Sequence, residues 1–185
     1  MSGGSGLPVS LPVTLVGQRC SGKSTSGRAL AKALGVGFVD LDDALVELAQ
    51  AGFGRTAGEL FEELGEPAFR GLEARALAQL LGQETPSFGV LATGGGAVLD
   101  AGSRELLRQR SICVWLRAEP DRLAERLIAD GTLRPSLTGA PPAEEMAAVA
   151  DQRRALYAEV AQHVLDVDDL DPDQVLLELQ ALLAE

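Results

Sequence analysis

The chain is poor in cysteine, histidine and aromatic residues, and each shortage excludes a class of protein. Its 185 residues include two cysteines, one histidine, one tryptophan, one tyrosine and five phenylalanines. Two cysteines cannot build the disulfide framework of a small secreted domain, and neither Cys20 nor Cys113 stands in a metal-binding spacing. No apolar run approaches the roughly 18 residues of a membrane-spanning helix, and the first residues lack the basic and apolar regions of a signal peptide. We therefore expect a cytoplasmic protein without a membrane anchor.

Positive charge is scarce as well. The 27 acidic residues outnumber the 16 basic ones, the formal net charge is −11, and only Lys23 and Lys32 are lysines. A nucleic-acid-binding protein needs a basic face or exposed stacking rings, so we expect neither a nucleic-acid nor a membrane partner. With 46% hydrophobic residues the chain is too apolar for a disordered acidic protein and can bury a core.

Short apolar segments alternate with helical patterns along most of the chain. Residues 1–10 form a Gly- and Ser-rich leader that we expect to be disordered, which leaves residues 11–185 as a single domain. The segments show little alternation of polar and apolar residues, as in parallel strands buried on both faces. The expected strands are Val13–Val16, Phe38–Val39, Val90–Ala92, Ile112–Leu116 and Val164–Val167. Strands that alternate with helices predict a three-layer α/β domain.

The helices between these strands begin at recognisable signals. Thr56–Glu59 is a capping-box pattern, and Pro120 and Pro172 stand where a helix can begin. The expected helices cover residues 23–34, 60–64, 70–81, 121–129 and 172–184. Residues 131–142 contain two glycines and three prolines without periodicity, so we expect a mobile loop there.

Residues 17–24 read Gly-Gln-Arg-Cys-Ser-Gly-Lys-Ser, a complete G-x-x-x-x-G-K-S phosphate-binding loop. The loop follows an expected strand and opens an expected helix, which is the context that the motif requires. Its glycines allow backbone N–H groups to surround phosphate oxygens, and the helix N-terminus adds partial positive charge. Lys23 is expected on the β- and γ-phosphates and Ser24 on Mg²⁺. A glycine-rich turn that only caps a helix is the alternative.

Carboxylates follow the second expected strand. Asp40 and Asp42 are two residues apart, so on an extended strand end they would point the same way. One could hold Mg²⁺ through water while the other accepts a proton from a substrate hydroxyl. Capping of the following helix by Asp42 or Asp43 is the alternative; we expect capping for Asp43 and a functional role for Asp40 and Asp42.

Two further patterns are candidates for substrate binding. Residues 65–73 contain Arg70 between Glu66 and Glu73, so ion pairs along a helix are the alternative to a binding role. Residues 94–96 are three consecutive glycines directly after an apolar strand, where a small polar ligand could approach the backbone closely.

These motifs occur in the order and approximate spacing of the shikimate kinases, and the chain resembles that family from about residue 11 to its end. The resemblance is carried by the phosphate loop and by Phe38–Asp42, Gly65–Glu73, Thr93–Gly96, Arg134–Leu137 and Arg153–Ala161. It implies a three-layer α/β/α P-loop NTPase fold of the nucleoside monophosphate kinase type, with five parallel strands in the order 2-3-1-4-5. It also implies a lid at about residues 131–142 and a substrate-binding helical segment at about residues 42–72.

The same resemblance implies a reaction and the residues that perform it. The reaction is ATP-dependent, Mg²⁺-assisted phosphorylation of the 3-hydroxyl of shikimate, a step of chorismate and aromatic amino acid biosynthesis. ATP would be held by Cys20, Ser21, Gly22, Lys23, Ser24, Thr25 and Arg134, and the metal by Ser24 and, through water, Asp40. Shikimate would be bound by Asp42, Arg70, Gly94, Gly95, Gly96 and Arg153, with both arginines on its carboxylate. The catalytic residues would be Asp42 as proton acceptor and Lys23 and Arg134 as stabilisers of the transferred phosphoryl group.

The chain departs from the family pattern in three places, one of which is the phosphate loop, where Gln18 and Arg19 are less common choices. Ser136 stands where the family usually has leucine, and residues 166–171 are acidic where the family places a basic or Gln contact to adenine. A backbone contact to adenine is the alternative there.

Two other functions stay open from the sequence. One is a kinase of another small hydroxy acid such as gluconate, and the other is a non-catalytic module that binds nucleotide without turnover. The triple glycine and Phe69–Arg70 favour shikimate, whereas intact Lys23 and Asp42 favour an enzyme. We expect a monomer.

Overall fold

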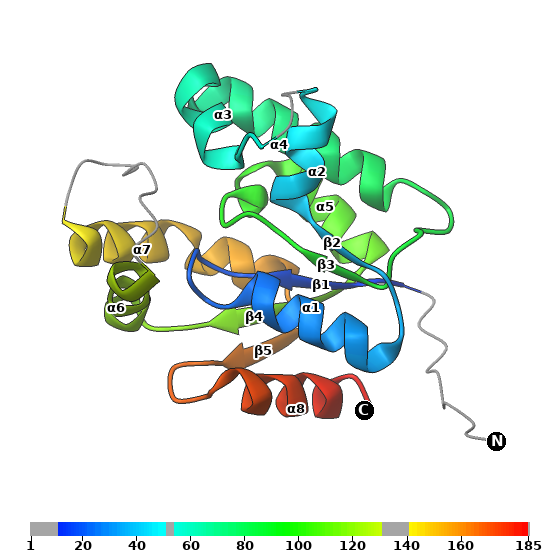
Figure 1. The fold of residues 1–185 in the computed structure, drawn as a ribbon, viewed down its shortest axis with the longest axis vertical. Coiled ribbons are helices and arrows are strands. Elements are labelled where there is room, and N and C mark those ends of the chain that lie inside the picture. Colours follow the sequence, from blue (N-terminus) through cyan, green and yellow to red (C-terminus); the bar gives the residue numbers. More distant parts are fainter. Residues whose placement is uncertain (1–10, 51–53, 131–140, 185) are drawn as a thin grey trace.

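The computed structural model describes residues 11–50, 54–130 and 141–184. The predicted parallel sheet is confirmed, and its strands lie side by side in the predicted order β2-β3-β1-β4-β5 (Figure 1). The strands are β1 (Val13–Val16), β2 (Phe38–Asp40), β3 (Val90–Ala92), β4 (Ile112–Arg117) and β5 (His163–Asp166). The central strand β1 pairs with β3 on one side and β4 on the other, and all of its side chains are buried.

Helices cover both faces of the sheet, which confirms the three-layer architecture (Figure 1). On one face α1 (Lys23–Leu34) and α8 (Pro172–Leu182) pack Leu30 and Leu179 against Leu15 of β1. On the other face the core includes α4 (Glu66–Leu81), α5 (Ala101–Arg110) and α7 (Pro142–Val160), packed against Val16 and Trp115. Burial of these apolar surfaces stabilises the sheet from both sides.

The remaining helices lie around the carboxyl ends of the strands. They are α2 (Leu41–Leu48), α3 (Ala57–Leu64), the short 3₁₀ turn η1 (Ala97–Leu99) and α6 (Pro120–Asp130). The predicted capping box at the start of α3 is confirmed, because Thr56 and Glu59 each accept a hydrogen bond from the other's backbone N–H. Helix α4 begins at Glu66, four residues before the predicted start, because Gly65 turns the chain at φ 74° and Pro67 fits the first turn.

The aspartates after β2 correct one prediction. Helix α2 begins directly at Leu41, so Asp42 lies in a first helical turn and not on an extended strand end. The N-cap is Asp40 and not Asp43, since an Asp40 carboxylate oxygen accepts a hydrogen bond from the Asp42 N–H at 3.1 Å. The capping bond satisfies a backbone donor that the helix itself cannot.

Two predicted features lie outside the described residues: the leader, residues 1–10, and the segment 131–140, which includes Arg134 and Ser136. None of the described helices combines the length and apolar character that crossing a lipid bilayer requires.

Candidate active site

The phosphate-binding loop connects β1 to α1, as its sequence predicts. Helix α1 starts after Gly22, whose φ of 90° turns the backbone, and no side chain of the described residues caps its first turn. Such a helix start offers backbone N–H groups and partial positive charge to an anion. Ser24 and Thr25, in the first turn, are exposed.

Lys23 lies folded back over the loop. Its side chain is only 7% exposed, and Nζ donates hydrogen bonds to the Gln18 carbonyl at 2.5 Å and to Ser21 Oγ at 3.4 Å. The ammonium group is therefore held within the concave loop, where phosphate oxygens would bind. Cys20 has a positive φ of 63°, and its side chain packs toward Met146 of α7 and the α6 residues Leu123 and Ala124.

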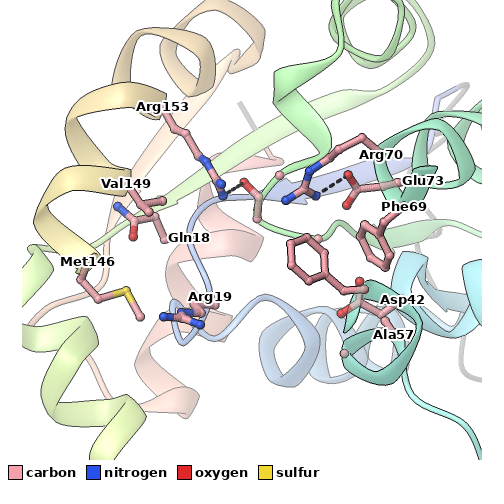
Figure 2. A pocket seen from close by; sticks show the side chains of 15 residues that line it. Gln18, Arg19, Asp42, Ala57, Phe69, Arg70, Glu73, Met146, Val149 and Arg153 are labelled. Carbon is pink, nitrogen blue, oxygen red and sulfur yellow. Dashed lines mark hydrogen bonds and ion pairs between the residues drawn. The ribbon is translucent and has the colours of Figure 1, made fainter. Parts of the chain in front are cut away.

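A pocket of about 130 Å³ lies beside this loop (Figure 2). Five parts of the chain contribute to it: the phosphate loop, α2, the α3–α4 region, the glycines after β3, and α7. Its lining comprises Gln18, Arg19, Asp42, Ala57, Gly58, Phe61, Phe69, Arg70, Glu73, Gly94, Gly95, Gly96, Met146, Val149 and Arg153. The pocket thus contains the six residues predicted to bind the second substrate.

One side of the pocket, here called the acidic wall, consists of Asp42, Arg70 and Glu73. Glu73 is only 3% exposed, and its carboxylate accepts a hydrogen bond from Arg70 Nη1 at 2.8 Å. Burial raises the pKa of Glu73 above its usual range, and the nearby Arg70 guanidinium opposes that shift. Arg70 Nε also lies 3.4 Å from Glu66, so both predicted ion pairs form while Arg70 still lines the pocket.

The consecutive glycines are required by the side chains that approach them. A Cβ on Gly94 would lie 2.5 Å from Glu73 Oε1 and 3.1 Å from Asp42 Oδ1. A Cβ on Gly96 would collide with the Arg70 guanidinium. The absence of side chains therefore allows the acidic wall to pack closely against the end of β3, where the carboxylates of Asp42 and Glu73 both approach Gly94.

The opposite side, here called the basic wall, consists of Arg153 with Met146 and Val149, all from α7. Arg153 is 7% exposed, and its Nη1 donates to the Gly95 carbonyl at 2.9 Å (Figure 2). It makes no ion pair with any described residue. Glu159, its predicted alternative partner, pairs with Arg104 instead. The buried Arg153 Nε has no hydrogen-bond partner within the described chain, which leaves a donor for a ligand.

Sequence reasoning missed several residues of this site. Gln18 and Arg19 line the pocket from the phosphate loop, and Arg19 forms an ion pair with the buried Glu145 of α7. The variable positions of the loop motif gave no signal for these contacts. Glu73 was visible in the sequence as an alternative partner of Arg70, and the structure places its buried carboxylate in the lining of the pocket.

Two further residues, Cys113 and His163, lie outside the site. Cys113 is fully buried in β4, and burial raises the pKa of its thiol to about 11, so it is an unreactive core residue. His163 begins β5, away from the pocket-lining residues. Neither cysteine forms a disulfide in the described chain.

The site's fold is shared with kinases of more than one substrate. A gluconokinase from Sinorhizobium meliloti 1021 superposes with a TM-score of 0.64 at 22% identity, covering 95% of this chain and 92% of its own. At that identity the likeness concerns the fold alone.

Closer likenesses all point to one family. The shikimate kinase family model matches residues 19–184. Shikimate kinase 2 of Yersinia enterocolitica serotype O:8 is 41% identical over 94% of this chain and 95% of its own. A shikimate kinase from Acinetobacter baumannii, solved in complex with shikimate, is 33% identical with a TM-score of 0.82, covering 95% of this chain and 94% of its own. A phosphate loop beside a pocket with an acidic and a basic wall thus coincides with family-wide sequence similarity, and this chain belongs to the shikimate kinase family.

Proposed function

We propose that this protein transfers the γ-phosphoryl group of ATP to the 3-hydroxyl of shikimate, forming shikimate 3-phosphate and ADP. The observation that carries the proposal is the pocket itself, which places a carboxylate wall and a guanidinium wall beside a nucleotide loop. A ring that bears hydroxyls on one side and a carboxylate on the other matches those two walls. The reaction supplies phosphorylated shikimate to aromatic amino acid biosynthesis.

The acceptor's carboxylate binds to arginine in this proposal. Arg153 keeps an unpaired Nε donor and has no carboxylate partner in the described chain, so it can receive the substrate's negative charge. A planar guanidinium binds a carboxylate through two parallel hydrogen bonds, which an ammonium cannot do. Arg70 contributes from the other wall, and the backbone at Gly94, Gly95 and Gly96 contacts the ring hydroxyls.

Asp42 acts as the proton acceptor. Its carboxylate lies against Gly94 in the pocket, where the reacting hydroxyl would approach the γ-phosphate. Phosphoryl transfer needs positioning and charge stabilisation more than covalent chemistry from the protein. Lys23 stabilises the transferred group from the loop. Arg134, which lies outside the described residues, would do the same.

The residues expected around Mg²⁺ fit a hard cation with few protein ligands. Ser24 presents an exposed hydroxyl, and Asp40 uses one carboxylate oxygen to cap α2. Within the described chain no three His, Cys, Asp or Glu side chains cluster as a metal site, whereas Mg²⁺ in kinases is held mainly by phosphates, water and one or two protein oxygens. Bound there, the metal would neutralise charge on the phosphates. The phosphate-loop residues Cys20–Thr25 would hold the nucleotide.

A substrate panel tests the proposal. Purified protein is supplied with ATP, Mg²⁺ and either shikimate or gluconate, and ADP release is followed in a coupled assay. We expect shikimate-dependent ADP release that disappears without Mg²⁺. Greater turnover of gluconate would replace the proposed acceptor, and ATP binding without turnover of either acid would identify a non-catalytic module.

The setting follows from the same features. We propose that the protein works as a cytoplasmic monomer, and its two cysteines, neither of which forms a disulfide within the described chain, fit a reducing compartment. Its oligomeric state can be measured by light scattering.

A further inference from the structure

The Gly95 carbonyl is the point where α7 meets the glycine run. It accepts two hydrogen bonds, from Arg153 Nη1 at 2.9 Å and from the Tyr157 hydroxyl at 2.6 Å. Arg153 and Tyr157 are four residues apart on α7, so both side chains lie on one face of that helix. Both lone pairs of one carbonyl oxygen are thus used by donors from one helix.

Tyr157 is fixed independently of this hydrogen bond. Its side chain is 1% exposed, and its ring stacks on Trp115 of β4 with centroids 5.6 Å apart and an interplanar angle of 28°. Burial raises the pKa of Tyr157 to about 12, so its hydroxyl remains protonated and donates throughout the neutral range. The Tyr157 hydroxyl is therefore a firmly placed donor to the Gly95 carbonyl.

Gly95 also borders the nucleotide loop. A Cβ placed on Gly95 would lie 3.3 Å from the Arg19 amide nitrogen and 3.5 Å from the Gly17 carbonyl oxygen. The Gly95 peptide thus lies where the acceptor pocket borders the nucleotide loop. Because its carbonyl accepts the hydrogen bond from Arg153, any displacement of this peptide would also move the Arg153 guanidinium.

We propose that Tyr157 is a positioning residue of the acceptor site: its hydroxyl fixes the Gly95 carbonyl and thereby orients the Arg153 guanidinium toward the substrate carboxylate. The inference rests on the proposed function, since it assigns Arg153 to shikimate. Tyr157 itself does not line the acceptor pocket. Its effect is therefore expected on the binding of shikimate and not on ATP.

The direct test is Tyr157→Phe, which removes one hydroxyl and keeps the ring that stacks on Trp115. We expect KM for shikimate to rise roughly fivefold to tenfold, the change expected from one lost hydrogen bond to a buried acceptor. KM for ATP and kcat are expected to stay within about twofold of wild type, because the loop and the base are unchanged. An unchanged KM for shikimate in a folded variant, or an equal rise in both KM values, overturns the inference.

Ser111→Ala is the matched control. The Ser111 hydroxyl is buried and donates to the Leu107 carbonyl at 2.8 Å, outside the pocket. This variant also loses one hydroxyl-to-carbonyl hydrogen bond, so it reports the effect of reduced stability alone. We expect KM for shikimate to stay at the wild-type value in Ser111→Ala, and a rise equal to that of Tyr157→Phe would count against positioning.

A measurement on the unsubstituted chain keeps the inference testable if Tyr157→Phe fails to fold. Tyr157 is the only tyrosine, so protein labelled with carbon-13 at the tyrosine ζ position gives one NMR signal. We expect shikimate alone to shift this signal, ADP alone to leave it in place, and Arg153→Lys to abolish the shift. A signal that ignores saturating shikimate overturns the inference.

The outcomes separate this inference from the proposed function. Wild-type turnover of shikimate with no effect at Tyr157 removes the positioning role and leaves the function intact. No turnover of shikimate by the wild type removes both.

Discussion

The acidic and basic walls of the pocket hold their arginines in opposite ways. Arg70 of the acidic wall lies between two carboxylates, Glu73 at 2.8 Å and Glu66 at 3.4 Å. Arg153 of the basic wall bonds to the neutral Gly95 carbonyl and pairs with no carboxylate of the described chain. Of these two arginines, only Arg70 forms an ion pair with a carboxylate of the described chain.

The difference indicates how the two arginines divide their work. A paired guanidinium is held in a fixed orientation, but part of its attraction for an anion is already used by its partners. A guanidinium without an ion-pair partner keeps more of its charge for the ligand, and Arg153 is held by its hydrogen bond to the neutral Gly95 carbonyl. We therefore expect Arg153 to supply most of the binding to the substrate carboxylate and Arg70 to contribute mainly orientation.

The largest expected effect comes from the acidic wall. Asp42→Asn removes the proton acceptor but keeps the shape of the side chain, so kcat should fall by roughly 10³-fold while KM for shikimate changes little. Steady-state kinetics with shikimate measure both. Asp43→Asn, which changes an exposed neighbour, serves as the control and should retain kcat. Wild-type kcat in Asp42→Asn would show that the carboxylate is not the base.

The basic wall is expected to give the next largest effect. Arg153→Ala should raise KM for shikimate roughly hundredfold, because a buried charged hydrogen-bond donor is lost, and should leave KM for ATP near its original value. Arg154→Ala changes the exposed neighbour on the same helix and should have no such effect. A larger increase in Arg70→Ala than in Arg153→Ala would reverse the proposed division between the walls.

The smallest effect concerns the contact between Glu73 and Arg70. Glu73→Gln keeps the side-chain shape but loosens Arg70, so KM for shikimate should rise by roughly threefold. Because the folded-state pKa of Glu73 lies above its unfolded value, the folded protein binds this proton more tightly. Glu73 therefore stabilises the fold less as pH rises above its unfolded pKa of 4.5 and through its folded pKa.

Urea unfolding at a series of pH values checks that sign. The free energy of unfolding of the wild type should decline through this window relative to Glu73→Gln. A wild-type stability that rises relative to the variant over the same range would contradict the raised pKa.

Local signals in the sequence predicted the fold well. The buried apolar segments, the phosphate loop, the Thr56 capping box and the helix at Pro120 are each determined by neighbouring residues, and all appear in the structure. The family resemblance supplied the strand order. The wrong details are also local: Asp40 competes with Asp43 for the cap of α2, and the first turn of α4 is fixed by Gly65 and Pro67 and not by the apolar periodicity that begins later in the helix.

The site was predictable only in part, because its geometry depends on distant segments. Asp42 and Arg70 stood in recognisable sequence patterns, whereas Arg153 was identified through the family resemblance alone. The contact of Arg19 with Glu145 and that of Tyr157 with Gly95 join positions far apart in the chain. Such pairs arise from the packing of α7 against the phosphate loop and against the glycines after β3, which no local pattern contains.

The central position of β1 also determines when the nucleotide loop can take shape during synthesis. β1 carries the loop, but its two neighbours, β3 and β4, follow much later in the chain. Strand pairing over such separations is formed late because loop closure must precede it. A nascent chain that has not yet emerged through Arg117 would contain the complete loop sequence on a strand that lacks at least one of its two neighbours, so we expect ATP binding to arise only after roughly the first two-thirds of the protein has been made.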